Sequence, residues 1–274
     1  MNVESQSRDL RFHDAHNHLQ DERFGGRQDE IVREAMRVGV HRMVVNGSCE
    51  QDWADVARLA QRFPCVIPSF GCHPWYVSSR TPEWERRLLE CLSVPGCALG
   101  EIGLDYWKAG LDRVAQEAVF IAQWRMGVER NLPLSIHCLK AWGRLEEILR
   151  REPRSSRGFL LHSYGGSAQM IPPLAKLGAF FSFPGYFLHS RKARQAATFR
   201  QVPQDRLLVE TDAPDQLPPE SAIEFPLGGE GSEPQLNHPA NLRRIYQGLA
   251  LTLGCPVEDL SHRVEKNFIA LFGD

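Results

Sequence analysis

Histidines with the spacing of metal ligands lie at the end of the first apolar segment of this 274-residue sequence. His16 and His18 are separated by one residue, and alternate residues of a β-strand point to the same side. The two imidazoles are therefore expected to face the same way, where they could chelate a divalent cation. A pair of this kind is only moderately specific, so the prediction depends on whether other segments supply further ligands.

Other apolar segments also end in histidines or carboxylates. If the segments are parallel strands whose carboxyl ends meet at one end of the fold, these side chains surround a common centre. Four imidazoles and two carboxylates exceed what one tetrahedral ion needs, which favours two ions with Glu101 as the bridge. An imidazole-rich site suits Zn, Mn, Fe or Co, while Mg could occupy a second, more open position. The predicted metal ligands are His16, His18, Glu101, His137, His162 and Asp212.

Weaker candidates lie beside this set. His73 is expected to act as a general acid or to hold a phosphate oxygen, unless it only bonds to the backbone of its loop. Asp105 is expected to bind substrate or a metal-bound histidine. His13 has the opposite parity to His16 in the predicted strand and should face the outside of the fold.

The elements that must position these residues alternate along the chain. Predicted strands start mostly about 25–35 residues apart, with 3.6-periodic segments between them, as in repeated strand–helix units. The predicted strands are Arg11–His18, Arg42–Asn46, Val66–Cys72, Ala98–Ile102, Leu134–Cys138, Phe159–Ser163, Ala179–Phe183 and Leu207–Thr211. The clearest predicted helices are Val114–Arg130, Leu145–Arg150, Ala240–Leu253 and Val257–Phe272.

Eight such units in this length predict an α/β fold, a (β/α)8 barrel, with a seven-stranded variant as the alternative. We expect one domain over residues 1–274. Residues 1–10 are expected to form a disordered tail. The proline-rich stretch 214–239 follows the eighth strand and is expected to be a long loop that forms one wall of the active site.

Composition excludes several classes of protein. The formal net charge is −2, which argues against a protein that coats nucleic acid. No apolar run approaches the about 20 residues of a membrane span. Seven cysteines without C-x-x-C spacing argue against a disulfide framework or a zinc ribbon. Together with a polar N-terminus, these features predict a cytoplasmic protein that does not associate with membranes, and we expect a monomer.

The arrangement of these motifs resembles the TatD family of metal-dependent deoxyribonucleases, within the amidohydrolase-like barrels. The resemblance covers almost the whole chain in order, and its glutamate and aspartate motifs are specific to that family. The matching segments are Asp14-Ala15-His16-Asn17-His18-Leu19, Gly71-Cys72-His73-Pro74, Gly100-Glu101-Ile102-Gly103-Leu104-Asp105-Tyr106, Leu132-Pro133-Leu134-Ser135-Ile136-His137, Leu161-His162-Ser163-Tyr164-Gly165-Gly166-Ser167 and Leu208-Val209-Glu210-Thr211-Asp212-Ala213-Pro214.

The resemblance implies hydrolysis of DNA phosphodiesters, as a 3′-5′ exonuclease, by water activated at two divalent metal ions. Asp212 would orient or deprotonate that water, Glu101 would bridge the metals, and His73 would assist the leaving group or grip phosphate. The predicted partner is a DNA end, with bases stacking on aromatic residues such as Tyr106, Trp107 or Trp75. The metal centre alone leaves other substrates open: RNA ends, an acylated nucleotide, an amide or a lactone. A barrel that binds metal without catalysis is a remote alternative.

Two departures from the family pattern concern the substrate. Where the family usually has Ser-Arg-Asp, this chain has Cys138-Leu139-Lys140, so Lys140 is the expected phosphate contact in place of an arginine. Where the family tends to have Asn-Glu-Pro, this chain has Asn237-His238-Pro239, and His238 is expected to face the site. The predicted substrate-binding residues are His73, Asp105, Tyr106, Lys140 and His238.

Overall fold

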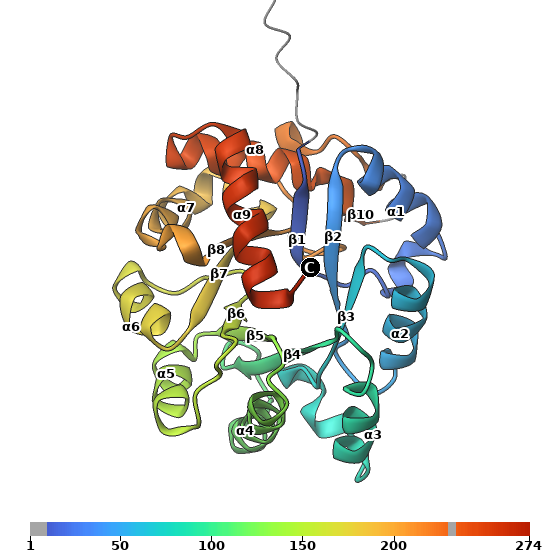
Figure 1. Ribbon diagram of the computed structural model, residues 1–274, viewed down its shortest axis with the longest axis vertical. Coiled ribbons are helices and arrows are strands. Elements are labelled where there is room, and N and C mark those ends of the chain that lie inside the picture. Colours follow the sequence, from blue (N-terminus) through green and yellow to red (C-terminus); the bar gives the residue numbers. More distant parts are fainter. Residues whose placement is uncertain (1–9, 230–233) are drawn as a thin grey trace, which may run out of the picture.

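Eight parallel strands form one sheet, with order β1 to β8, in a computed structural model that describes residues 10–229 and 234–274. The sheet curves into a nearly closed barrel with helices around it (Figure 1). The predicted eight-stranded barrel is confirmed, and the seven-stranded alternative is wrong. The strands are β1 (Phe12–Asn17), β2 (Val40–Asn46), β3 (Val66–Phe70), β4 (Ala98–Asp105), β5 (Leu134–Leu139), β6 (Phe159–Leu161), β7 (Ala179–Pro184) and β8 (Leu207–Glu210).

The helices follow the strands in the order that the periodicity predicts. Their buried residues face the sheet, because each amphipathic helix buries its apolar face against the strands. They are α1 (Gln28–Arg37), α2 (Trp53–Arg62), α3 (Trp84–Cys91), α4 (Arg113–Glu129), α5 (Trp142–Arg151), α6 (Ile171–Lys176), α7 (Ala193–Thr198), α8 (Leu242–Leu253) and α9 (Val257–Phe272). His13 packs against Phe268 of α9, with ring centroids 4.8 Å apart, on the outer side of β1 as expected from its parity.

The boundaries of one strand differ from the prediction in a way that matters. The strand predicted as Ala98–Ile102 continues to Asp105, so Glu101 lies in the middle of β4 rather than at its end. The extension passes through Gly103, whose φ is +147°. A Cβ at this position would lie 1.9 Å from the carbonyl oxygen of His137 on β5, so only glycine permits the close pairing of these strands.

The barrel is closed between β8 and β1 without a regular ladder in the described residues. Two backbone hydrogen bonds join the strand ends: His18 N–H donates to Ala213 O (2.7 Å) and Asp212 N–H to His16 O (2.9 Å). The buried Asp14 carboxylate adds a side-chain link, accepting from the backbone N–H of Thr211 (2.9 Å) and from its hydroxyl. This junction holds the segments that carry His16, His18 and Asp212 together.

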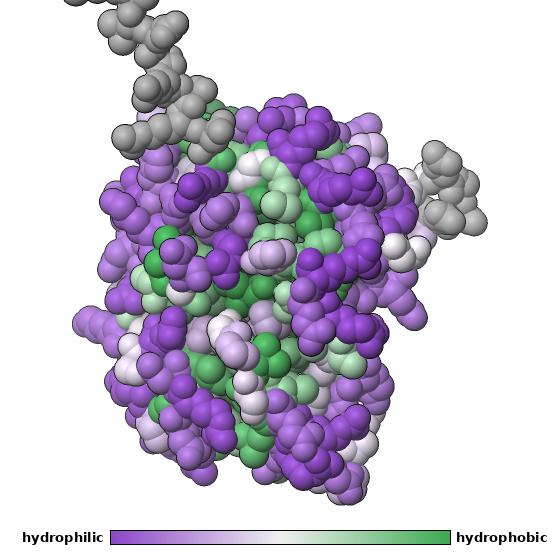
Figure 2. All heavy atoms as spheres, turned by 45° about the vertical axis from the view of Figure 1, so that its right-hand side comes forward, coloured by the Kyte–Doolittle hydropathy of each residue, from purple (hydrophilic) through white to green (hydrophobic). Residues whose placement is uncertain are grey.

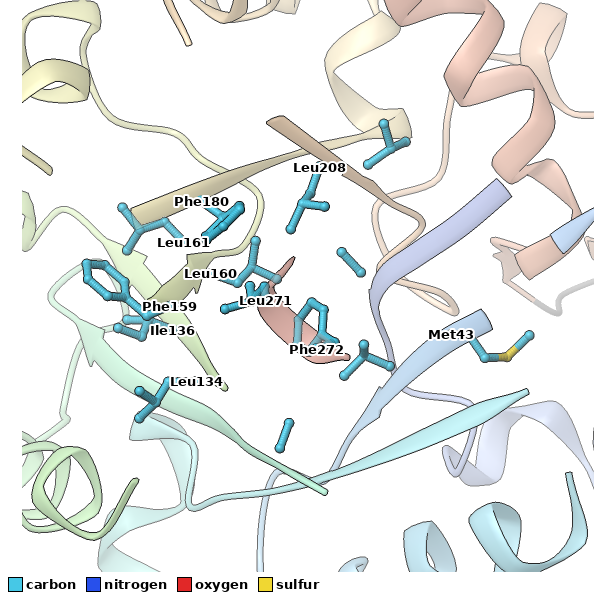
Figure 3. Close-up of a cluster of buried hydrophobic side chains, with 14 of the residues drawn as sticks. Met43, Leu134, Ile136, Phe159, Leu160, Leu161, Phe180, Leu208, Leu271 and Phe272 are labelled. Carbon is cyan, nitrogen blue, oxygen red and sulfur yellow. The ribbon is translucent and has the colours of Figure 1, made fainter. Parts of the chain in front are cut away.

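The C-terminal helix packs under the opposite end of the barrel. Asn267 Nδ2 donates to Gln204 O and Leu207 O, at the start of β8, at 2.8 and 2.9 Å. Arg157, which precedes β6, donates to Leu271 O (2.9 Å). Figure 3 shows Leu271 and Phe272 among buried strand side chains such as Leu160 and Leu208. Each fully buried side chain of this kind stabilises the fold by about 1.5–3 kcal/mol.

The outer surface is polar where the helices meet solvent. Figure 2 shows hydrophilic residues over the flanks of one face, with hydrophobic and near-neutral residues through its middle. In the part of the chain that is described, no helix combines the length and apolar character needed to cross a bilayer.

The stretch predicted as a loop, 214–239, contains a 3-10 turn (Glu220–Ala222) and a short antiparallel pair, β9 (Leu227–Gly228) and β10 (Gln235–Leu236). Its start contacts the mouth of the barrel, because Gln216 Nε2 donates to Ser163 Oγ (3.0 Å), next to His162. The predicted disordered tail, residues 1–10, falls almost entirely outside the described residues, which begin at Leu10.

Candidate metal centre

The six predicted metal ligands converge at the mouth of the barrel. His16 lies in β1, Glu101 in β4 and His137 in β5, while His18, His162 and Asp212 follow the ends of β1, β6 and β8. His18 is partly exposed and the others are buried. Three groups have ligand atoms within 4.8 Å of one another: His16, His18 and Glu101; His16, His162 and Asp212; and His73, Glu101 and His137.

Glu101 lies between two sets of donors. Its Oε2 is 3.4 Å from His16 Nε2 and 3.3 Å from His18 Nε2. Its Oε1 is 3.0 Å from His137 Nδ1 and 2.8 Å from His162 Nε2. Burial opposes ionisation, but the imidazoles of His73, His162 and His16 hold the pKa of Glu101 well below its usual range. A buried carboxylate with one oxygen facing each set has the arrangement of a bridging ligand.

The tautomer of His18 follows from its neighbours. Its Nδ1 is 2.7 Å from Asn46 O, and a carbonyl only accepts, so Nδ1 carries the proton. In the neutral ring, Nε2 then presents a lone pair to Glu101 Oε2 and to Asp212 Oδ1, which is 3.6 Å away. Burial lowers the pKa of His18, but Glu101 and Asp212 raise it to about 9, so this nitrogen binds a cation strongly, either a proton or a metal.

His137 has the same arrangement with the ring nitrogens exchanged. Its Nε2 lies 3.2 Å from Asp105 Oδ2, so this nitrogen donates and Nδ1 presents its lone pair to Glu101 Oε1. Asp105 is buried and accepts three more hydrogen bonds, from Trp75 Nε1 (2.6 Å) and the backbone N–H of Trp107 (2.8 Å) and Lys108 (3.0 Å). Of the two roles expected for Asp105, this geometry favours orientation of a histidine over contact with substrate.

His73 presents a hydrogen to the site instead of a lone pair. Its Nδ1 accepts from the backbone N–H of Trp75 (3.2 Å) at the start of the 3-10 helix Pro74–Ser79. The neutral ring therefore carries its proton on Nε2, 3.4 Å from Glu101 Oε1. Burial lowers the pKa of His73 to about 4. Although its distances resemble those of a metal ligand, its tautomer is that of a hydrogen-bond donor.

Asp212 is the second carboxylate at the mouth. Its backbone has φ +54°, a left-handed conformation that turns the chain just after β8. Its Oδ1 lies 3.7 Å from His16 Nε2 and 3.6 Å from His18 Nε2. Burial raises the pKa of Asp212 to about 7. A carboxyl group that is costly to ionise in this position becomes an effective ligand or base once positive charge is bound nearby.

Sequence reasoning missed two residues that support the cluster, Glu210 and Ser135. Glu210, buried at the end of β8, accepts from Ser163 and Ser182 and lies 3.6 Å from His162 Nδ1. Ser135 Oγ lies 2.9 Å from His16 Nδ1. Glu210 has the same strand parity as Asp212, which was an available signal; Ser135 offered none, because its role depends on pairing between strands distant in sequence.

Three predicted substrate residues do not join the cluster. His238 is wrong as a residue facing the site: its Nε2 pairs with Glu34 of α1 (3.1 Å), and its Nδ1 accepts from the N–H of Ala240. The Tyr106 hydroxyl donates to Glu117 on α4 (2.6 Å). Lys140 is exposed just after β5, with φ +53° and no ion pair in the described part of the chain. In the first two cases a nearby helix supplies a partner that the sequence did not reveal.

The donor set fits divalent metal ions. Carboxylate oxygens of Glu101 and Asp212 lie 3.0–3.7 Å from ring nitrogens of His16, His18 and His137. Carboxylates and imidazole lone pairs this close together repel one another unless protons or metal cations lie among them. The buried cluster therefore indicates a metal site.

Comparison with known proteins gives one consistent result. The sequence model of the family described as "TatD related DNase" matches residues 13–273. A 3′-5′ ssDNA/RNA exonuclease TatD from Escherichia fergusonii is 27% identical over 257 residues, which cover 93% of this chain and 96% of that protein. An uncharacterized metal-dependent hydrolase, YabD of Bacillus subtilis, is 29% identical over 224 residues, or 81% of this chain and 85% of its own length.

Solved structures share the fold. A TatD homolog from Escherichia coli, YjjV, superposes with a TM-score of 0.85 at 24% identity and covers 97% of this chain and 99% of its own. An uncharacterized amidohydrolase from Saccharomyces cerevisiae superposes with a TM-score of 0.77 at 19% identity, covering 96% and 100%. At these identities the superpositions support the barrel and not a particular reaction.

Proposed function

The chain belongs to the TatD-related DNase family, and from this premise we propose that it is a metal-dependent phosphodiesterase that removes nucleotides from the 3′ end of single-stranded nucleic acid. The observation that carries the proposal is the position of Glu101, whose two carboxylate oxygens face separate sets of histidines. We propose two divalent ions, Zn, Mn, Fe, Co or Mg, one on each side of this residue. We also propose that the protein is a cytoplasmic monomer, and its seven free cysteines fit a reducing compartment.

The residues divide into two sides. His16, His18 and Asp212 would hold one ion, and His137 and His162 the other, with Glu101 common to both. Bound cations supply Lewis acidity, lowering the pKa of water toward about 7 and neutralising charge that develops on phosphate oxygens.

Protein side chains would carry out the proton transfers and bind the phosphate. Asp212, which lies at the mouth beside His16 and His18, would orient the attacking water and accept its proton. His73 carries a hydrogen on Nε2, which can be given to the leaving oxygen or donated to a phosphate oxygen. Lys140, exposed after β5, is proposed to contact a phosphate as a mobile point charge.

The test is hydrolysis of 5′-end-labelled single-stranded DNA and of RNA with the same sequence. Metal-loaded protein should shorten one or both strands from the 3′ end, and a chelator should abolish the reaction. Glu101→Gln should reduce the rate to background, because the amide cannot hold two cations. Glu152→Gln, which changes a carboxylate paired with Arg125 far from the cluster, is the matched control and should retain activity.

Intact strands together with turnover of an amide, a lactone or an acylated nucleotide by the same metal-loaded sample would refute nuclease activity. Metal-loaded protein that turns over no member of this panel would support a barrel that binds metal without catalysis. Metal analysis of the isolated protein, with about two equivalents expected, tests the centre independently of activity.

A further inference from the structure

The indole ring of Trp75 lies between the histidine cluster and solvent. Trp75 follows β3 and is half-buried. Its ring makes edge contacts with His73 (centroids 5.2 Å apart, interplanar angle 83°) and His137 (6.5 Å, 69°). The side chain of Lys108 extends over its face, with Nζ 3.9 Å from the ring centroid. A flat aromatic surface therefore lies directly beside the side chains proposed to act on phosphate.

The ring is fixed, whereas the cation over it is not. Trp75 Nε1 donates to the buried Asp105 carboxylate (2.6 Å), and the Trp75 N–H donates to His73 (3.2 Å). Lys108 is anchored only through its backbone N–H, which also donates to Asp105 (3.0 Å). Its exposed ammonium forms no ion pair with a carboxylate anywhere in the described segments. If Lys108 leaves the ring, it loses the cation–π contact but no side-chain hydrogen bond or ion pair with the described residues.

We propose that the face of Trp75 is a nucleobase subsite, where the base of the nucleotide being released stacks in place of the Lys108 ammonium, which then pairs with the adjacent phosphate. This inference rests on the proposed nuclease function. The chemistry favours this ligand, because every base has a π-face that stacks on an indole irrespective of sequence. A lysine ammonium, a compact cation on a flexible stem, suits a phosphate oxygen at a variable position.

The experiment compares two DNA strands that differ only at the 3′-terminal residue, which either carries a base or is abasic. The ratio of kcat/KM for the two strands is measured for each variant, so that any loss of folding or metal affects both strands alike. Wild-type protein should prefer the base-bearing end by about 5- to 150-fold, the range associated with one stacked base. Trp75→Leu should bring this ratio close to one, and Trp75→Phe should retain most of it.

Lys108→Ala should slow hydrolysis of both strands and reduce the dependence on salt concentration, because a phosphate contact is lost, while the preference for a base persists. Lys176→Ala, at an exposed position near the end of α6, is the matched control and should leave rates and ratio unchanged. A wild-type ratio in Trp75→Leu would overturn the subsite even if the nuclease activity is real.

Absence of hydrolysis by the wild-type protein would instead refute the proposed function. In that case, binding of AMP and of ribose 5-phosphate, measured by titration calorimetry, tests the subsite without turnover. Tighter binding of AMP that is lost in Trp75→Leu supports the subsite. Equal binding of the two ligands overturns it.

Discussion

Replacing Asp105 by asparagine should weaken one metal position while leaving the barrel intact. Asp105 Oδ1 accepts from the backbone N–H of Trp107 (2.8 Å) and Lys108 (3.0 Å). Its Oδ2 accepts from Trp75 Nε1 (2.6 Å) and faces His137 Nε2 (3.2 Å). An amide has one oxygen and one NH2 group, so in either orientation two donors meet the NH2 group.

The amide orientation that costs the least free energy removes a lone pair that metal binding needs. If the amide oxygen keeps the two backbone N–H groups, the NH2 group faces His137 Nε2, which must then lose its hydrogen and accept. The proton moves to Nδ1, the nitrogen that faces Glu101 Oε1 at 3.0 Å, and the lone pair needed for a cation is lost. Removing a carboxylate that orients a histidine ligand typically costs 10- to 100-fold in metal affinity, or about 1.4–2.7 kcal/mol.

The assay is competition for metal against a chromophoric chelator, which resolves strong and weak binding steps. In Asp105→Asn one step should weaken by this factor, whereas the step assigned to His16 and His18 should remain near its wild-type affinity. Circular dichroism reports whether the fold is retained, and Glu152→Gln serves as the matched carboxylate-to-amide control. Two unchanged affinities in a folded Asp105→Asn protein would show that Asp105 does not set the tautomer of His137.

Three further predictions concern stability, measured by urea unfolding. Asp14→Ala leaves the buried Thr211 N–H unpaired at the junction of β8 and β1 and should destabilise the barrel by about 2–4 kcal/mol. Gly103→Ala would place a carbon 1.9 Å from His137 O and should cost about 4 kcal/mol or more. Burial lowers the pKa of His13 from 6.5 to about 4. As the pH falls below 6.5, the unfolded chain therefore binds a proton before the folded protein does, and the free energy of unfolding decreases. The wild-type protein should lose about 2 kcal/mol of stability through this residue between pH 7 and pH 5, and His13→Phe should remove that loss.

Each of these three stability predictions has a control variant and an outcome that would contradict it. Thr211→Val removes the hydroxyl that contacts Asp14 and the Ala213 N–H but keeps the backbone N–H bond to Asp14, so it should cost less than Asp14→Ala; the reverse order would mean that the backbone bond is not the main link. Gly143→Ala, at a position with no atom within 4 Å of an added Cβ, should leave stability unchanged or higher. If wild type and His13→Phe lose the same stability between pH 7 and pH 5, His13 is not the group that causes the loss. His262→Gln, at an exposed position, tests whether replacing any histidine has the same effect.

The order of elements and the types of ligand were determined by the sequence. Buried parallel strands are continuous apolar runs, and six of the eight runs in this chain carry, within the strand or just after it, a residue that reaches the mouth. Strand parity correctly separated His13, on the outer side of β1, from the predicted ligands His16 and His18. These features are local, so they could be predicted without knowing which strands are neighbours. The role of every residue in the site, and the assignment of a single domain, stay predictions.

Only the tertiary structure decided what each polar group does. Whether a histidine presents a lone pair or a hydrogen depends on the partner of its other nitrogen: Asn46 O for His18, Asp105 for His137 and the Trp75 N–H for His73. The partners of His18 and His137 lie on other strands, and the Glu34 carboxylate that pairs with His238 lies on helix α1; only the partner of His73 is a neighbour in the sequence. A tautomer is set by hydrogen-bond geometry over about 3 Å, and residue types and spacing along the chain carry no information at that scale.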